Sequence, residues 1–411
     1  MCDSDNSKES VIKLFNQHFE NTLKPSLAKG DEYVAWKDNA DISTNENAIQ
    51  LIAFYLPQFH PIPENDQWWG KGFTEWTNVS KAVPQFIGHY QPRFPDELGF
   101  YDLRLIEVQR RQIEIAKNYG VYGFCYHHYW FAGKRLLEKP VQQVLDNSDL
   151  DFPFCLCWAN ENWSRRWDGS ENEILMAQEH SAEDDIAFIK DIEVALKDKR
   201  YIRINGKPLL IVYRVSLLPE PKKTAQRWRD YCQLCGIGEI HLVAAQSFGI
   251  TSPEPFGFDA VVEFPPHGAP VPQMNAGLKF VRDDFTGSVH QYSELIKSRE
   301  KYVEYGYRCY RTAVPAWDNQ ARKPNGGSIY HKSTPELYGE WLEKICDHTE
   351  VVSIDKDKLV FVNAWNEWAE GAYLEPDRKY GYAYLQKTYD VLQRVENKKN
   401  NWLISFKKMR K

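Results

Sequence analysis

From residue 51 onward, the sequence alternates short apolar runs with longer segments of helical period, and this alternation occurs eight times. The short runs are rich in aromatic and β-branched residues, as strands are, and the longer segments repeat apolar residues every three to four positions. Strands that alternate with helices favour parallel pairing, with the helices covering the sheet. The eight strand-like runs are 51–57, 121–130, 153–160, 208–215, 241–247, 259–267, 309–318 and 359–368.

Helices are expected in the segments between these runs. They are predicted at 102–119, 182–196, 221–235, 289–305, 335–348 and 382–395. Eight strand–helix units over 51–395 predict an α/β fold, a (β/α)8 TIM barrel with long aromatic-rich βα loops, for which about 250 residues is typical. The weakest unit is 247–258, whose two prolines leave little room for a helix. A doubly wound open sheet is the alternative, but the first run lacks the glycine-rich phosphate-binding turn that such a sheet would carry.

The two ends of the chain differ from this repeating region. Residues 1–48 are polar and poorly patterned, apart from a short helical pattern at 11–19. We predict three parts, namely a polar N-terminal extension at 1–48, a (β/α)8 catalytic domain at 49–396 and a basic C-terminal tail at 397–411.

Charge and composition exclude several functional classes. The chain has 51 Lys and Arg against 57 Asp and Glu, a net charge of −6, which gives no electrostatic reason to bind nucleic acid or an anionic membrane. No run approaches the about 18–20 apolar residues of a transmembrane segment, and residues 1–30 lack the apolar core of a signal peptide. A chain of 411 residues does not need disulfides to hold a core, so we expect the eight cysteines to be reduced and the protein to be cytoplasmic.

The polar residues of the strand-like runs collect at one end of each run. The runs begin with aliphatic residues and end with Trp, His, Asn, Gln, Glu or Arg, and packing alone would not produce this arrangement. In (β/α)8 barrels the active site lies at the C-terminal ends of the strands. We therefore expect these side chains to surround an active site.

The eighth run carries two candidate catalytic carboxylates. Its alternation places Asn363, Trp365 and Glu367 opposite the aliphatic residues, toward the barrel mouth. Glu370 follows three residues later, and a helical turn there would put the Cβ atoms of Glu367 and Glu370 about 5–6 Å apart. Retaining glycosidases use carboxyl groups about 5–5.5 Å apart, and mutual repulsion beside Trp365 and Trp368 would raise one pKa. A solvated acidic turn at a helix start is the alternative interpretation.

Two aromatic loops also indicate a carbohydrate site. They lie at 67–76 and 162–169, where Trp residues are interleaved with polar and charged residues. Trp faces stack on sugar rings and polar groups bind hydroxyls, although buried Trp residues that only fix the loops would give the same pattern. Candidate substrate-binding residues from the loops and strand ends are Tyr55, Gln58, His60, Trp68, Trp69, Glu75, Trp76, His128, Trp130, Trp158, Asn160, Glu161, Arg165, Tyr213, Glu263, His267, Trp317, Asp318, Asn363, Trp365 and Asn366.

A metal or cofactor is not expected. His127 and His128 are neighbours on a strand and point to opposite faces, so they cannot chelate one metal. A metal site built from His60, His128, Glu263 and His267 is an alternative that we do not favour. The sequence also lacks a G-x-S-x-G elbow, a P-loop and a dinucleotide-binding fingerprint, which counts against ester hydrolysis, kinase and dehydrogenase activity.

Four motifs of the chain are Leu51 to His60, the loop from Trp68 to Trp76, Cys155 to Gly169, and Asn363 to Gly371. Together they resemble the WbsX family. That family is classed with glycoside hydrolase family 99-like proteins and is labelled as glycosyltransferases of lipopolysaccharide O-antigen biosynthesis. The resemblance covers about 51–395 and is more specific for the family than for the reaction.

Family 99 endo-α-mannosidases are TIM barrels with a catalytic Glu-Trp-His-Glu motif, to which Glu367-Trp368-Ala369-Glu370 is similar. The resemblance implies that Glu367 is the general base that takes the proton from the 2-hydroxyl of the substrate, whose oxygen then forms an anhydro-sugar. It also implies that Glu370 is the acid that protonates the leaving oxygen. Ala369 replaces the family's His, which leaves the substrate contact and the mannose preference open.

The resemblance implies an enzyme that makes or breaks a glycosidic bond. Glycosyl transfer in O-antigen or other surface polysaccharide biosynthesis is the leading interpretation. A retaining endo-α-mannosidase-like glycoside hydrolase and a non-catalytic glycan-binding barrel are the alternatives. The expected partners are an oligosaccharide or polysaccharide substrate and, for a transferase, an activated sugar donor, with no nucleic acid.

Overall fold

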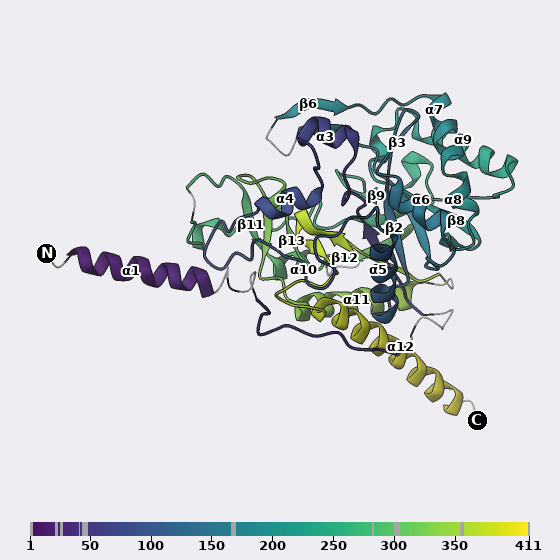
Figure 1. The fold of residues 1–411 in the computed structure, drawn as a ribbon. Coiled ribbons are helices and arrows are strands. Elements are labelled where there is room, and N and C mark those ends of the chain that lie inside the picture. Colours follow the sequence, from purple (N-terminus) through teal and green to yellow (C-terminus); the bar gives the residue numbers. More distant parts are fainter. Residues whose placement is uncertain are drawn as a thin grey trace.

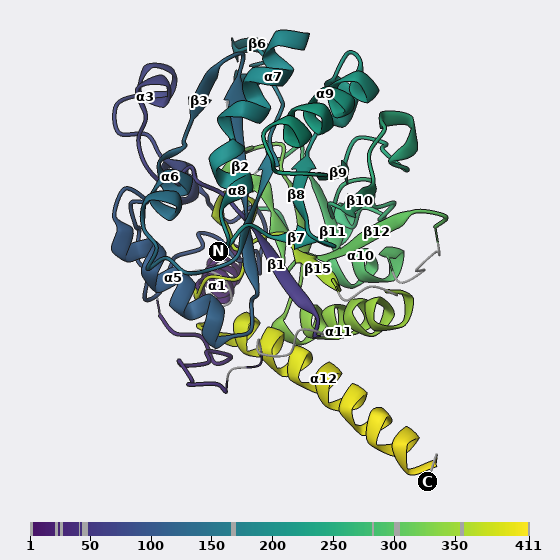
Figure 2. The same ribbon diagram turned by 90° about the vertical axis from the view of Figure 1, so that its right-hand side faces the viewer.

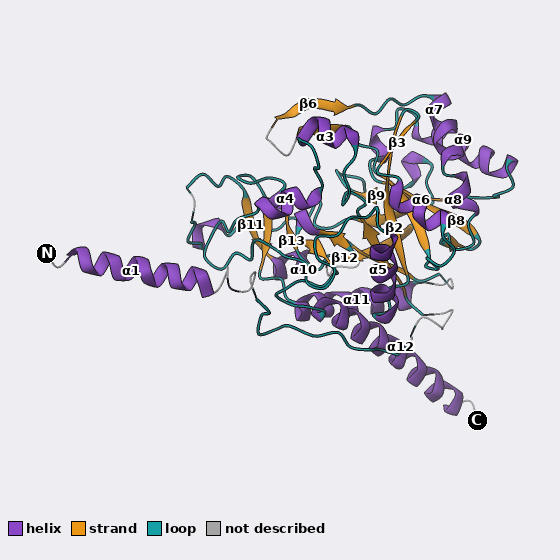
Figure 3. Cartoon of the chain, viewed as in Figure 1, coloured by secondary structure: helices purple, strands orange, loops and turns teal. Residues whose placement is uncertain are grey.

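The structure is a computed structural model that describes residues 3–20, 24, 28–40, 42, 48–165, 170–281, 283–299, 305–353 and 357–409. At its centre lies a barrel of parallel strands with helices around it (Figures 1 and 3). The barrel strands are β1 (Gln50–Tyr55), β2 (Gly123–Phe131), β4 (Phe154–Trp158), β8 (Lys207–Val212), β9 (His241–Gln246), β10 (Ala260–Glu263), β12 (Arg308–Ala313) and β15 (Leu359–Val362). Their order is β1–β15–β12–β10–β9–β8–β4–β2, and parallel pairing of β2 with β1 closes the ring.

The predicted (β/α)8 barrel is confirmed. Each of the eight strands begins in or next to the run that predicted it and extends at most one residue beyond that run. All residues of β2 and β4 are buried, as expected for parallel strands that are covered on both faces. Inside the ring, Phe54 stacks on Phe361 with ring centroids 5.4 Å apart and meets Phe264 at 4.9 Å, so aromatic rings fill part of the barrel interior.

The outer helices alternate with the strands and surround them in Figure 2. They are α5 (Ile106–Asn118), α6 (Lys139–Asp146), α7 (Ala182–Asp191), α8 (Glu193–Lys197), α9 (Pro221–Leu234), α10 (Tyr292–Arg299), α11 (Pro335–Val352) and α12 (Ala383–Met409). The unit predicted to be weakest, at 247–258, is described throughout and contains the short 3₁₀ turn η4 (Glu254–Phe256) as its only helical element.

One helix prediction is wrong at its start. Residues 288–291, expected to begin a helix at 289, form strand β11 (Ser288–Gln291). The reason is tertiary packing, because Val289 is fully buried in a small apolar cluster with Phe86 and Ile329. The predicted helix at 182–196 is divided into α7 and α8, and residues 300–304 of the predicted helix at 289–305 lie outside the described residues.

Short elements in the loops add to the barrel. The first βα loop holds α3 (Pro63–Trp69) and α4 (Glu75–Lys81), which the sequence did not predict. Further strands are β3 (Lys134–Leu136), β5 (Trp163–Arg165), β6 (Ser170–Met176), β7 (Arg203–Ile204), β13 (Trp317–Asp318), β14 (Ser328–His331), β16 (Asn366–Glu367) and β17 (Ala372–Tyr373). A small sheet of order β11–β14–β13 and the antiparallel pair β16–β17 carry residues of the site described below.

Part of the predicted N-terminal extension packs on the barrel domain. Trp36 meets Tyr119 and Tyr382 with ring centroids 5.6 and 5.4 Å apart, and the backbone of Val34 exchanges hydrogen bonds with residues 380 and 382. The helix α1 (Asp3–His18) projects away from the barrel, and so does the far end of α12, which continues past residue 396 (Figure 1). The domain limits at 48 and 396 stay predictions.

Within the described ranges, no helix combines the length and the apolar character needed to cross a bilayer.

Candidate active site

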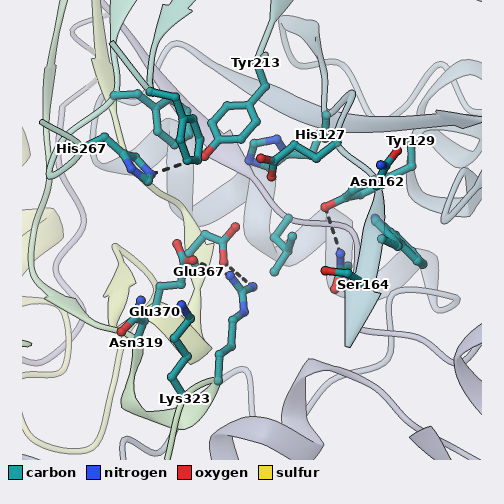
Figure 4. Close-up of a pocket in the computed structure, with 18 of the residues that line it drawn as sticks. His127, Tyr129, Asn162, Ser164, Tyr213, His267, Asn319, Lys323, Glu367 and Glu370 are labelled. Atoms are coloured by element: carbon teal, nitrogen blue, oxygen red, sulfur yellow. Dashed lines mark hydrogen bonds and ion pairs between the residues drawn. The ribbon is translucent and has the colours of Figure 1, made fainter. Parts of the chain in front are cut away.

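A cavity of about 380 Å³ opens at the C-terminal ends of the barrel strands. Its wall combines carboxylates, basic groups, histidines and aromatic rings, drawn as sticks in Figure 4. The lining residues are Leu56, Gln58, Trp69, His127, Tyr129, Ala159, Glu161, Asn162, Trp163, Ser164, Leu175, Tyr213, Phe248, Phe264, His267, Trp317, Asn319, Arg322, Lys323, Glu367 and Glu370.

Both predicted catalytic carboxylates line this cavity. Glu367 ends β16 and Glu370 ends the 3₁₀ turn η7 (Trp368–Glu370) that follows directly. The start of this segment is fixed by Asn366, whose side-chain amide accepts a hydrogen bond from the backbone N–H of Leu56 (2.7 Å) and donates one to the Leu56 carbonyl (3.0 Å). These hydrogen bonds attach the segment to the end of β1, and the two acids face the barrel mouth.

The buried side of the η7 turn is also fixed. The Trp368 indole stacks on Tyr373 with centroids 3.8 Å apart and donates a hydrogen bond from Nε1 to the buried carboxyl of Glu375 (2.6 Å). Gly371 ends the turn with φ of +61°, and a Cβ atom there would lie 3.0 Å from Cβ of Asp318. Only glycine adopts this backbone conformation without strain.

One arginine bridges three carboxylates at the site. Arg322 donates from Nη2 to Glu367 Oε2 (2.8 Å) and from Nη1 to Glu370 Oε1 (2.6 Å). The same guanidinium donates from Nη2 and Nε to Glu75 Oε2 at 2.8 and 3.1 Å. Because Glu367 and Glu370 bind adjacent nitrogens of one planar group, their carboxyl groups lie well within the limit of about 9.5 Å that glycosidase pairs span.

The charge balance of this cluster favours a protonated acid. Burial raises the pKa of Glu370 to about 7, Arg322 opposes this rise, and the nearby charges of Glu367 and Glu75 add to it. A carboxyl with a pKa near neutrality can hold a proton and donate it at neutral pH. This is the property expected of a general acid.

Aromatic rings form two groups along the cavity. In the first, the Tyr213 hydroxyl lies 3.3 Å from Nε2 of His267, and the His267 ring lies 6.1 Å from Trp317 between centroids. In the second, Tyr129 meets Trp163 at 5.3 Å between centroids. In Figure 4, Glu367 and Glu370 lie below His267 and Tyr213, and Tyr129 lies on the right-hand side of the cavity. Such surfaces suit the apolar faces of sugar rings.

Eight of the residues proposed from the sequence meet at this cavity. They are Gln58, Trp69, Glu161, Tyr213, His267, Trp317, Glu367 and Glu370.

The expectation for β2 chose the wrong face of the strand. His127 and Tyr129 line the cavity, whereas His128 and Trp130 face the helices. Nε2 of His128 lies 3.7 Å from a carboxylate oxygen of Asp191, and the Trp130 indole donates to Asp184 (2.9 Å). Since both faces of β2 are buried, the sequence contains no polar and apolar contrast that would identify the inner face.

Other proposed residues are buried in the framework around the cavity. Tyr55 donates to Gln112 of α5 (2.7 Å), Trp76 donates to the Tyr101 carbonyl (2.8 Å), and Asn363 donates to the Pro265 carbonyl (3.0 Å). Trp158 stacks on Phe188 at 4.3 Å, and Trp365 meets Phe124 at 4.9 Å between centroids. Asn366, described above, belongs to the same group, and none of these six lines the cavity.

The remaining proposed residues hold loops and strand ends. Asn160 and the backbone of Arg214 exchange two hydrogen bonds (2.8 and 2.9 Å), and Trp68 meets Trp163 at 5.7 Å between centroids. Asp318 accepts hydrogen bonds from His89 and Gln91, both at 2.7 Å, and is discussed below. The side chain of Arg165 and residues 166–169 lie outside the described part of the chain.

The alternative metal site does not assemble. His60 contacts the Pro57 carbonyl (3.0 Å), His128 faces α7, and Glu263 pairs with Arg311 (2.7 Å), so only His267 of the four lines the cavity. Among the described residues, no group of three or more His, Cys, Asp or Glu side chains could hold a metal ion.

The most informative residue that the sequence did not indicate is Arg322. It lies in the segment after β13, where no periodic pattern marks it. Other lining residues that were not proposed individually are Leu56, His127, Tyr129, Ala159, Asn162, Trp163, Ser164, Leu175, Phe248, Phe264, Asn319 and Lys323.

Comparison with known proteins decides the family. Residues 51–388 match the model of the family described as "Glycosyltransferase WbsX". The chain belongs to the WbsX family. Two curated relatives, both named "Uncharacterized protein WxcX" and from two strains of Xanthomonas campestris pv. campestris, are 50% identical over 345 residues. The match covers 84% of this chain and 50% of each relative, so the chain spans about half the length of these relatives.

Solved structures share the fold of this WbsX family member. A "Glycoside hydrolase-like protein" has a TM-score of 0.55 at 14% identity, covering 90% of this chain and 99% of that one. The GH99 endo-α-mannosidase of Bacteroides thetaiotaomicron in complex with BIS-TRIS-propane has a TM-score of 0.53 at 16% identity, covering 87% and 99%. At these identities the likeness concerns the fold. The barrel therefore shares its fold with these two structures.

Proposed function

We propose that this WbsX family member transfers a glycosyl group during the assembly of a surface polysaccharide such as an O-antigen, with Glu367 and Glu370 as its catalytic pair. The observation that carries the proposal is the placement of these two carboxyls on one guanidinium inside an aromatic cavity at the barrel mouth. The family description supports transfer, and the family 99-like fold supports glycosidase-type chemistry.

The proposed roles follow from the positions of the protons. Glu370 donates its proton to the glycosidic oxygen as the bond from that oxygen to the anomeric carbon breaks. Glu367 accepts the proton of the sugar's own 2-hydroxyl, whose oxygen forms the new bond to the anomeric carbon and gives an anhydro-sugar. In the second half, Glu370 takes a proton from the acceptor hydroxyl as that oxygen attacks, and Glu367 returns its proton to the 2-oxygen. Two inversions leave the anomeric configuration retained.

The nature of the acceptor decides between transfer and hydrolysis. If a sugar hydroxyl attacks, the product is a new glycoside, whereas water gives the free sugar. The aromatic rings of both groups, which include Trp317 in the first and Trp163 in the second, and the further lining residue Trp69 offer stacking surfaces for more than one sugar. An acceptor that is held there would compete with water, and this favours transfer.

Hydrolysis is the second candidate function. It is supported by the endo-α-mannosidase whose fold this barrel shares, and by two acids three positions apart in a similar motif. A barrel that binds glycan without turnover is a third outcome of the experiment below.

The experiment is a screen of the purified protein against mannose-linked oligosaccharides, with and without nucleotide sugars. Transfer predicts elongated products, and hydrolysis predicts shortened ones. The glycan that reacts is then tested with Glu367→Gln, for which we expect a loss of turnover by several orders of magnitude while glycan binding persists. Unchanged turnover would remove Glu367 from the mechanism, and binding without any turnover in the wild-type protein would leave the binding function alone.

A further inference from the structure

We propose that Arg322, anchored by the buried carboxylate of Glu75, is a positioning residue that assigns the proton of the site to Glu370 and keeps it off Glu367. This inference rests on the proposed glycosidic function and adds a role for two residues, Arg322 and Glu75, that lie beside the catalytic pair.

The three carboxylates that bind Arg322 differ in position. Glu75 is buried behind the cavity and anchors the guanidinium, whereas Glu367 and Glu370 line the cavity. The Glu75 side chain is 0% exposed and does not line the cavity, whereas Glu370 is 20% exposed and does. Glu75 also accepts a hydrogen bond from Asn78 (2.8 Å), so its carboxyl is held from behind by the helix α4. Nε and Nη2 of Arg322 bind this anchor, which leaves Nη1 for Glu370 and shares Nη2 with Glu367. Arg322 therefore cannot turn away from the acids without breaking its contact with Glu75.

A second contact set holds the backbone that carries Arg322. Asp318, which is fully buried, accepts a hydrogen bond from the backbone N–H of Gln320 (3.1 Å) and caps the turn η6 (Asn319–Ala321). Its other oxygen accepts from His89 and Gln91. Since the backbone N–H of Arg322 bonds to the Asn319 carbonyl (3.1 Å), the guanidinium starts from a fixed turn.

The cluster has more negative than positive charge. Among the described contacts, three carboxylates bind one guanidinium, so the ionised acids would carry two more negative charges than this guanidinium neutralises. An excess of buried charge is costly, and one bound proton lowers that cost. Glu75 accepts three hydrogen bonds from Arg322 and one from Asn78, and Glu367 shares the Nη2 that also binds Glu75. Glu367 and Glu370 each accept one hydrogen bond from Arg322, and Glu370 lies apart from the other two acids on Nη1. Burial and the charges of Glu367 and Glu75 raise the pKa of Glu370 to about 7, so the proton is held there.

Other titratable groups face the same acids. Tyr213, His127, His267 and Lys323 line the cavity, and Tyr129 lies near Glu367. Burial lowers the pKa of His267 to about 4, so this ring is neutral at pH 7. The variants described below leave these groups unchanged, so a shift in the titration of Glu370 can be attributed to Glu75 or Arg322.

The test uses two variants with opposite expected shifts. Glu75→Gln removes one negative charge and still accepts hydrogen bonds from Arg322, so Glu370 should lose its proton about one to two pH units lower. Arg322→Gln removes the cation and keeps a donor, so Glu370 should lose its proton at higher pH. The matched control is Asp185→Asn, a buried acid that pairs with Arg227 (2.7 Å) between α7 and α9, for which no shift is expected.

Two measurements follow the proton of Glu370. Infrared difference spectroscopy detects the carbonyl stretch of a protonated carboxyl, which is assigned to Glu370 by its loss in Glu370→Gln. This assignment is needed because burial also raises the pKa of Glu375 to about 7. The second measurement is the alkaline limb of the pH profile of kcat/KM with the reacting glycan.

The outcomes separate this inference from the proposed function. If the pH at which Glu370 loses its proton shifts in opposite directions in the two variants, the inference is supported, even when no glycan is turned over. The absence of turnover would refute only the proposed function. If the variants turn over glycan but the alkaline limb of their kcat/KM profiles does not shift, the role proposed for Arg322 and Glu75 is overturned. A shift in the same direction in both variants would overturn it as well. In either case the proposed function stays intact. If Arg322→Gln does not fold, a downward shift in Glu75→Gln supports the inference and an absent or upward shift overturns it.

Discussion

Two buried clusters of acids and arginine in this barrel have opposite charge balance. Within the described part of the chain, Glu263 of β10 pairs with one arginine, Arg311 of β12 (2.7 Å), and also accepts from the backbone N–H of Thr312 (3.2 Å). At the barrel mouth, Arg322 is shared by three carboxylates. Among the described contacts, the first cluster pairs one acid with one base, and the second has an excess of acid. The difference teaches that a balanced pair stabilises neighbouring strands, whereas an unbalanced cluster retains a proton that is available for chemistry.

The largest expected effect is on turnover. Glu370→Gln removes the proposed proton donor while it keeps the size of the side chain, so turnover should fall by about 10²–10⁴-fold, the usual contribution of general acid catalysis. Asp185→Asn, which alters a buried pair on the outer helices, should stay within a few-fold of wild type. Initial rates with the glycan from the screen give both values. Equal rates for Glu370→Gln and wild type would show that the unbalanced cluster does not supply the proton.

The next effect concerns the balanced pair. Arg311→Met leaves Glu263 buried without its cation, which should lower the free energy of unfolding by about 3–5 kcal/mol. Urea unfolding measures this loss. The pH profile of kcat/KM should be the same as in wild type. A shifted profile would show that Glu263 and Arg311 affect the catalytic step.

The pH dependence of stability should distinguish the unbalanced cluster. Burial raises the pKa of Glu370 from 4.5 to about 7 in the folded protein, so the folded state binds the proton more tightly than the unfolded state. This contribution is fully present below pH 4.5 and is lost as the pH rises toward 7, a change of about 3 kcal/mol. Glu370→Gln should remove that part of the pH dependence when unfolding is compared at pH 5 and pH 8. Parallel curves for the variant and wild type would contradict the raised pKa.

The smallest expected effect is at the turn that carries the acids. Gly371→Ala places a Cβ atom 3.0 Å from Asp318 at a backbone φ of +61°, and should cost about 1–2 kcal/mol of stability. Because this turn follows Glu370 directly, turnover should fall as well. Thermal unfolding together with initial rates tests both, and a stable variant with full turnover would show that the turn is less constrained than its contacts indicate.

Much of the fold could be predicted from the sequence because two periods alternate along the chain. Each barrel strand corresponds to an apolar run, and the polar ends of these runs correctly indicated the barrel mouth as the place of the cavity. The short helices α3 and α4 could not be predicted, because seven residues are too few to show a helical period. At β11, the prediction of a helix was wrong because the burial of Val289 favours a strand there.

The sequence indicated which residues line the cavity where a residue's position follows from its strand, but not where the position depends on distant contacts. Glu367 and Glu370 follow the eighth strand within a few residues, and their approach could be inferred from local spacing. Arg322 reaches Glu75 from 247 positions away, and no local pattern contains that contact. His127 was missed for another reason, since both faces of β2 are buried and alternation alone cannot identify the inner one.

The most direct test of the central claim is the crystal structure of Glu367→Gln with the glycan that the screen selects. The account predicts a glycan in the cavity at the barrel mouth, with its glycosidic oxygen within hydrogen-bond distance of the Glu370 carboxyl and its sugar rings against Tyr213, Trp317 or Trp163. A glycan bound elsewhere on the protein, or one whose glycosidic oxygen lies beyond the reach of Glu370, would contradict it.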